Sequence, residues 1–145
     1  MDAKIARKIF DTTVKACISF RQSFRKEIPL SFLLVYPDGS VREVPAVAGI
    51  SKQELADFVQ GLASKSGAVY VLSVGEAWCS ASSNGPPSQQ ADRFEVLMVT
   101  IEGPDLHLIA TAPITEAGTV DQEPVVSNTF SGRFSNLVGS PEEYH

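Results

Sequence analysis

Three acidic side chains flank a polar stretch in the second half of the chain. Glu76 lies near the end of one apolar, strand-like run, and Asp92 and Glu95 lie at the start of the next. If the two runs pair, the three carboxylates converge, and clustered carboxylates bind hard cations or share a proton, as metal-assisted hydrolysis requires. We therefore name them as candidate catalytic or metal-binding residues. In the alternative interpretation they are surface acids, one of which pairs with Arg93 or Arg133.

Other residues with reactive side chains form no recognisable site. Cys79 and His107 are the residue types of a thiol nucleophile and its base, but nothing in the sequence places them together. The chain contains no phosphate-binding glycine loop, nucleophile elbow or metalloprotease helix. Two histidines and two distant cysteines argue against a zinc site. We expect no cofactor and no resident metal.

An aromatic row follows one predicted strand. Strand alternation puts Tyr70, Glu76 and Trp78 on one face and Cys79 on the other. Exposed aromatic side chains beside an acid would form a docking surface for a protein partner, so Tyr70 and Trp78 are candidate binding residues. The alternative is that these rings belong to the core, and this alternative is stronger for Tyr70 than for Trp78.

The first segment is basic, although the chain as a whole has a net charge of −5. Residues 1–27 hold seven bases and three acids, a balance of +4, and the remainder holds five bases and fourteen acids, a balance of −9. This segment could bind a polyanion through Arg21, Arg25 and Lys26. It is also explained by a solvated helix face that complements an acidic body. Nucleic acid is not the expected partner, because the bases lack interleaved exposed aromatics.

Two helices are predicted to frame these residues. The first spans 3–26, with an apolar face that we assign to Ala6, Phe10, Thr13, Cys17, Phe20 and Phe24. The second begins at the capping sequence from Ser51 to Glu54 and ends at Gly67. Between them, the turn 36–40 predicts a hairpin of strands 31–36 and 41–46.

Three further strands are predicted at 68–79, 94–101 and 106–112. Pairing Ile101 with Leu106 places the apolar residues of the last two strands on one face. Residues 80–93 read as a flexible loop, and 113–128 could hold a short edge strand. Phe130, Phe134 and Leu137 could form a short helix before a frayed tail at 139–145.

These elements predict a single α+β domain over residues 1–145, with an antiparallel sheet of about five strands and flanking helices. Their order resembles the roadblock and profilin-like folds, which is an analogy of fold and carries no function. No apolar run approaches the roughly 20 residues that span a bilayer. The first residues lack the apolar centre of a secretory signal. We therefore expect a cytoplasmic protein that does not contact membranes.

The sequence "EAW" at 76–78 and "PPSQQADRFEVLM" at 86–98 resembles an uncharacterised bacterial protein family. Its members carry a Glu-Ala-Trp strand, then Pro-Ser, then Asp-Arg-x-Glu-Val-Leu. The resemblance covers about 25 residues and implies no activity. It implies that one unit is formed by Glu76, Trp78, Pro87, Ser88, Asp92, Arg93 and Glu95. Arg93 thereby joins the candidate binding residues.

Three functions remain open. The leading hypothesis is a non-enzymatic module that binds a protein partner or associates with itself, for example as a homodimer. The second is a metal-dependent hydrolase or nuclease that uses the three carboxylates. The third is polyanion binding by the basic first helix.

Overall fold

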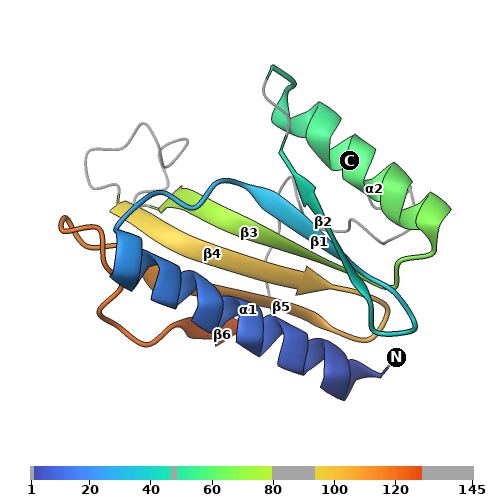
Figure 1. Cartoon of the computed structure of the whole chain (residues 1–145), viewed down its shortest axis with the longest axis horizontal. Helices are drawn as coiled ribbons and strands as arrows, with labels where there is room; N and C mark the ends of the chain where they lie inside the picture. The colour runs from blue at the N-terminus through green and yellow to red at the C-terminus, as the bar shows by residue number, and fades with distance from the viewer. Residues whose placement is uncertain (1, 47–48, 80–93, 129–145) are drawn as a thin grey trace.

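The computed structural model describes residues 2–46, 49–79 and 94–128 as an α+β domain (Figure 1). The elements are α1 (Ala3–Phe24), β1 (Ser31–Val35), β2 (Val41–Pro45), α2 (Lys52–Ser66), β3 (Tyr70–Cys79), β4 (Phe94–Glu102), β5 (His107–Pro113) and β6 (Val125–Ser127). In these residues the strands form one antiparallel sheet in the order β2-β1-β3-β4-β5-β6. The predicted class is confirmed, with six strands instead of about five, because the short edge strand expected within 113–128 forms as β6.

Both helices begin and end at residues that satisfy their terminal backbone groups. The Asp2 side chain accepts a hydrogen bond from the Ile5 amide at 3.0 Å, and Arg25 ends α1 in the left-handed conformation. The Ser51 hydroxyl accepts a bond from the Glu54 amide at 3.1 Å, and Gly67 ends α2 at a φ of 81°. The predicted second helix is therefore confirmed at both ends.

The β1–β2 hairpin also forms where the sequence predicts it. The Tyr36 amide donates to the Ser40 carbonyl at 3.0 Å, and Gly39 adopts a φ of 86°. Asp38 accepts hydrogen bonds from the amide and the hydroxyl of Ser40, and these bonds lower the pKa of its carboxyl group. The turn therefore owes its shape to the Tyr-Pro-Asp-Gly-Ser sequence itself.

The β4–β5 register corrects one prediction. Ile101 lies opposite Leu108, two residues beyond the expected Leu106. The reason is the position of the turn, which residues 103–106 form, one residue later than the predicted 102–105. The Gly103 amide closes it on the Leu106 carbonyl at 2.8 Å. A shift of two residues leaves every side chain on its predicted face, because strands alternate with period two.

Two apolar clusters lie on opposite faces of the sheet. The larger joins α1 to β3, β4 and β5 and includes Phe10, Leu72 and Val99. The smaller joins α2 to β1 and β2. Because Leu72 belongs to the first cluster and its neighbour Val71 to the second, the clusters are separated by the thickness of the sheet. Figure 1 shows α1 running along the sheet and α2 lying beyond β1 and β2.

Candidate functional site

Glu76 is held in a buried ion pair. Its Oε2 accepts a hydrogen bond from Arg21 Nε at 2.9 Å, and its Oε1 accepts one from Arg21 Nη2 at 2.5 Å. The Ile28 amide donates to Oε2 at 2.8 Å. Only 7% of the Arg21 side chain and 4% of the Glu76 side chain are exposed. Both carboxylate oxygens therefore have partners within the fold, and the residue anchors α1 to β3.

The last turn of α1 is also fastened to residues 115–121. Arg21 Nη1 donates to the Gly118 carbonyl at 3.4 Å. The Gln22 amide group donates to the Val120 carbonyl and accepts from the Val120 amide, each at 2.9 Å. This burial corrects the prediction that Arg21 contacts a polyanion, because its guanidinium is directed into the protein. Arg25 and Lys26, the other two residues of that prediction, are exposed.

Tyr70 is a core residue, which corrects its proposed role in docking. It is 2% exposed, and its hydroxyl donates a hydrogen bond to Asp105 Oδ1. Burial, followed by the contact with Asp105, raises the pKa of the Tyr70 hydroxyl to about 12. The ring is thus part of the packing between β3 and the turn at 103–106.

Trp78 lies next to the last residue of β3 and is 42% exposed. It is directly opposite Glu95, so the two residues share the face that also carries Glu76. Asp92, Arg93 and the predicted loop 80–93 lie outside the described residues, as do the predicted short helix and the tail at 139–145. Convergence of the three carboxylates therefore stays a prediction.

The side chain of Cys79 lies outside the described part as well, so its pairing with His107 is also untested. Within residues 2–46, 49–79 and 94–128, no group of three or more His, Cys, Asp or Glu residues could hold a metal ion.

The sequence prediction missed two exposed phenylalanines on α1. Phe20 and Phe24 are 37% and 61% exposed, and their ring centroids are 5.1 Å apart. The face of α1 that enters the core instead carries Ala6, Phe10, Val14, Cys17 and Arg21. The apolar face was therefore assigned one residue off in the last turns, where an arginine points inward and the aromatic rings point outward.

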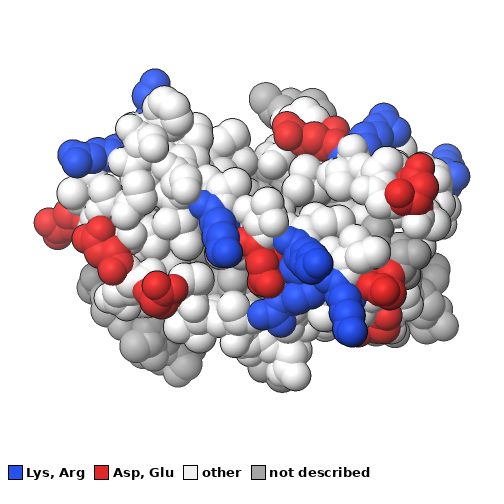
Figure 2. Space-filling view, turned by 60° about the horizontal axis from the view of Figure 1, so that its bottom comes forward, with Lys and Arg blue, Asp and Glu red and all other residues white. Residues whose placement is uncertain are grey.

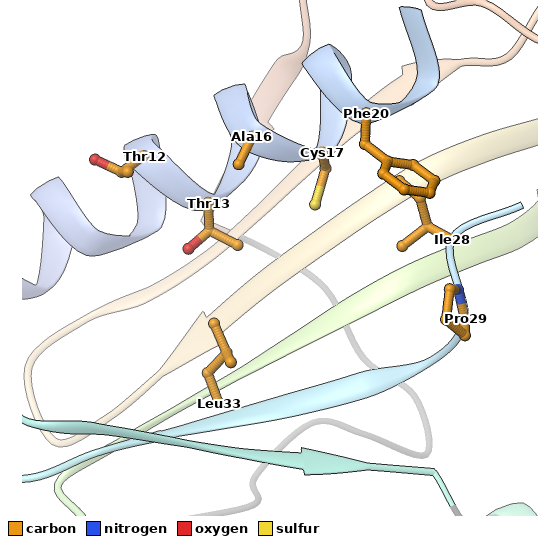
Figure 3. A pocket seen from close by; sticks show the side chains of 8 residues that line it. All are labelled: Thr12, Thr13, Ala16, Cys17, Phe20, Ile28, Pro29 and Leu33. Atoms are coloured by element: carbon orange, nitrogen blue, oxygen red, sulfur yellow. The ribbon is translucent and has the colours of Figure 1, made fainter. Parts of the chain in front are cut away.

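An apolar groove of about 370 Å³ lies between α1 on one side and β1 with the segment that precedes it on the other. The residues that line it are Thr12, Thr13, Ala16, Cys17 and Phe20 from α1, and Ile28, Pro29 and Leu33 from the segment that enters and forms β1. Figure 3 shows the Cys17 side chain pointing from α1 toward the sheet and the Phe20 ring beside Ile28, with Leu33 reaching up from the sheet. Two elements that are adjacent in sequence thus form both walls.

The groove lining is uncharged. Thr13 turns its hydroxyl hydrogen back to the Ile9 carbonyl at 2.7 Å, which leaves its methyl group for the groove. Burial raises the pKa of the Cys17 thiol to about 11, so the sulfur stays protonated at neutral pH. Such a lining suits apolar side chains and offers little to a charged metabolite.

Two basic side chains lie next to this groove on the helix side. Lys8 lies one turn before Thr12 and Lys15 one turn after it, on the same side of α1, and both are exposed. Figure 2 shows Lys and Arg side chains gathered over α1 with acidic groups between them. On α1, Asp11 pairs with Arg7, with Asp11 Oδ1 and Arg7 Nε 3.1 Å apart. On the sheet side, Glu43 is the cross-strand partner of Leu33.

No protein-family model matches the chain, and neither do any curated proteins or solved structures. The resemblance to a bacterial family with a Glu-Ala-Trp strand therefore stays a prediction, as does the roadblock-like analogy. Neither α1 nor α2, the helices of the described residues, is long and apolar enough to cross a membrane. The fold and the groove define an α+β domain with an apolar recess beside its first helix.

Proposed function

We propose that this protein is a non-enzymatic interaction module that binds a protein partner through the groove beside α1. The observation that carries the proposal is the apolar, uncharged groove with the exposed rings of Phe20 and Phe24 at its end. Aromatic rings beside a recess are typical anchors of protein interfaces, because they bury large areas at low entropic cost. A cytoplasmic location suits this function and stays a prediction.

The carboxylate hypothesis receives less support from the same structure. A metal ligand must present lone pairs to the ion, whereas Glu76 accepts hydrogen bonds on both oxygens from Arg21 and Ile28. Its charge is balanced by the guanidinium inside the fold. We therefore favour binding over metal-assisted hydrolysis.

A homodimer that pairs two α1 helices is also disfavoured. Residues 1–27 carry a balance of +4, of which Arg21 is used internally against Glu76. Symmetric pairing would place the basic surfaces of two copies against each other, and like charges across an interface oppose association. The groove is better suited to a different chain.

Selection from a random displayed peptide library tests the proposal. The wild-type protein is the bait, and Ala16→Trp, which fills the groove from an exposed helix position, is the counter-bait. We expect enriched peptides with a Kd below about 100 μM that bind Ala16→Trp at least about tenfold more weakly.

Ser64→Trp, at an exposed position of α2, is the matched control and should bind like the wild type. Circular dichroism verifies that both variants are folded. If no enriched peptide distinguishes Ala16→Trp from the wild type, the groove is not a binding site and the proposal fails.

A further inference from the structure

We infer that the partner segment is an amphipathic helix whose apolar anchors enter the groove and whose acidic side chains face the lysines of α1. This inference rests on the proposed function and specifies its ligand. It follows from three properties of the groove, namely its length, its lack of orienting polar groups and the two exposed lysines next to it on α1.

The length of the groove fits a helical segment. The α1 residues that line it run from Thr12 to Phe20, which is about 12 Å along a helix axis, or roughly two turns. A partner helix that lies along α1 presents side chains at i, i+3, i+4 and i+7 over this distance. Two or more consecutive anchors can therefore enter the same recess.

The lining fits apolar side chains better than a small polar molecule. Binding sites for metabolites combine an apolar wall with a few placed polar groups that fix orientation. Here the wall consists of Ile28, Pro29, Leu33 and the α1 residues, with the Thr13 hydroxyl donating to its own helix. Such a site selects by shape and apolar area, as helix-in-groove interfaces do.

Charge then determines the polar face of the partner. Exposed Lys8 and Lys15 lie on the solvent side of α1, four residues before and three residues after the groove residue Thr12. The remainder of the chain is acidic, with a balance of −9 over residues 28–145. The basic balance thus belongs to residues 1–27, which contain the α1 side of the groove, and complementary potentials steer and orient acidic partners.

A membrane surface is the main competing occupant, since basic helices with exposed aromatics also bind anionic lipid. We favour a peptide because the apolar surface is recessed. Cys17 is 9% exposed at the border of the groove, and Leu33 is half-buried within it. A flat bilayer would touch the rims of this recess and leave its floor unfilled.

The peptides enriched in the selection above provide the test. We expect those that lose binding to Ala16→Trp to contain more Asp and Glu than the unselected library, beside apolar residues at helical spacing. By fluorescence anisotropy, Lys8→Glu/Lys15→Glu should bind them at least about tenfold more weakly at about 50 mM NaCl, with a smaller difference at about 300 mM. Lys52→Glu/Lys65→Glu on α2 makes the same change of charge and should bind like the wild type.

Each other outcome has a distinct meaning. If peptides sensitive to Ala16→Trp are neutral or basic, or are unaffected by the lysine reversals, the acidic partner is excluded while the interaction module survives. If no peptide is sensitive to Ala16→Trp, both proposals fail. If vesicles of anionic phosphatidylglycerol bind the protein and displace the peptides, and both Ala16→Trp and the lysine reversals weaken that binding, the surface binds lipid and the inference is overturned.

Discussion

The two edges of α1 differ in what they contact. Its core edge is formed by Ala6, Phe10, Val14, Cys17 and Arg21, and its groove edge by Thr12, Thr13, Ala16 and Phe20. The core edge ends in a charged residue with 7% of its side chain exposed, whereas the groove edge ends in an aromatic ring that is 37% exposed. Residue type alone therefore does not determine which edge enters the core.

The position of Glu76 explains why the charged Arg21 is buried while the aromatic Phe20 is exposed. Glu76 lies on the face of β3 that packs against α1. A carboxylate there is costly to bury unless a cation and hydrogen-bond donors satisfy it. Arg21 supplies two donors from the last turns of α1, and the Ile28 amide supplies a third. Once Arg21 faces inward, Phe20 is turned toward the groove. The two edges should therefore respond differently to substitution, the core edge in stability and the groove edge in binding.

The largest expected effect is at the charged end of the core edge. Arg21→Met keeps an apolar stem but leaves Glu76 buried without its cation, so we expect a loss of about 3–5 kcal/mol in the free energy of unfolding. Urea denaturation measures it. The double variant Arg21→Met/Glu76→Gln should recover part of this loss, because no uncompensated charge remains. Arg25→Met, at an exposed position, is the control, and a loss below about 1 kcal/mol for Arg21→Met would contradict the account.

A smaller effect on the free energy of unfolding is expected where Tyr70, on the α1 side of β3, contacts the turn after β4. A Cβ atom added at Gly103 would lie 2.2 Å from Tyr70 Cδ1 and 2.9 Å from the Val69 carbonyl oxygen. Gly103→Ala should therefore lower the free energy of unfolding by about 1–3 kcal/mol. Gly61→Ala in α2 is the matched control. A Cβ there meets nothing within 4 Å, so it should raise stability by about 0.5–1 kcal/mol. Equal effects of the two variants would contradict the packing described for Tyr70.

The smallest expected effect on stability comes from the thiol of Cys17, which lies where the core edge and the groove edge of α1 meet. Burial raises the pKa of its thiol from 9.0 to about 11. The folded state therefore holds this proton more tightly than the unfolded state, and its contribution to stability is complete below pH 9 and is lost as the pH rises toward 11. In a Cys79→Ser background, a thiol reagent at about pH 8 should react slowly with the folded protein and rapidly in urea. Equal rates in the two conditions would show that the thiol is not buried.

Much of the fold is encoded in local sequence signals. The cap at Ser51, the glycine at Gly67 and the turn at 36–40 each act within a few residues, and the elements form where these signals place them. The β4–β5 register was predicted on the correct face but two residues away, because a period of two cannot distinguish pairings that differ by two. Local patterns thus predict elements and faces better than partners.

The surroundings of Glu76 and the groove depend on contacts between residues that are far apart in the sequence, so less of them could be predicted. Glu76 and Trp78 share a face as expected, but the partner of Glu76 is 55 residues away on another element. Nothing in the local spacing of α1 indicates that Arg21, which follows Phe20, is the inward residue. The groove likewise needs α1 and β1 to be placed against each other, so no motif marks it.

The most direct test of the central claim, that the groove edge binds and the core edge stabilises, is an NMR titration. A peptide that is enriched in the selection and sensitive to Ala16→Trp is added to the ¹⁵N-labelled protein. The account predicts that amide shift changes concentrate at Thr12, Thr13, Ala16, Phe20 and Leu33, which line the groove. Shift changes concentrated instead around Trp78 near the C-terminal end of β3, with the amides of the groove residues unchanged, would contradict it.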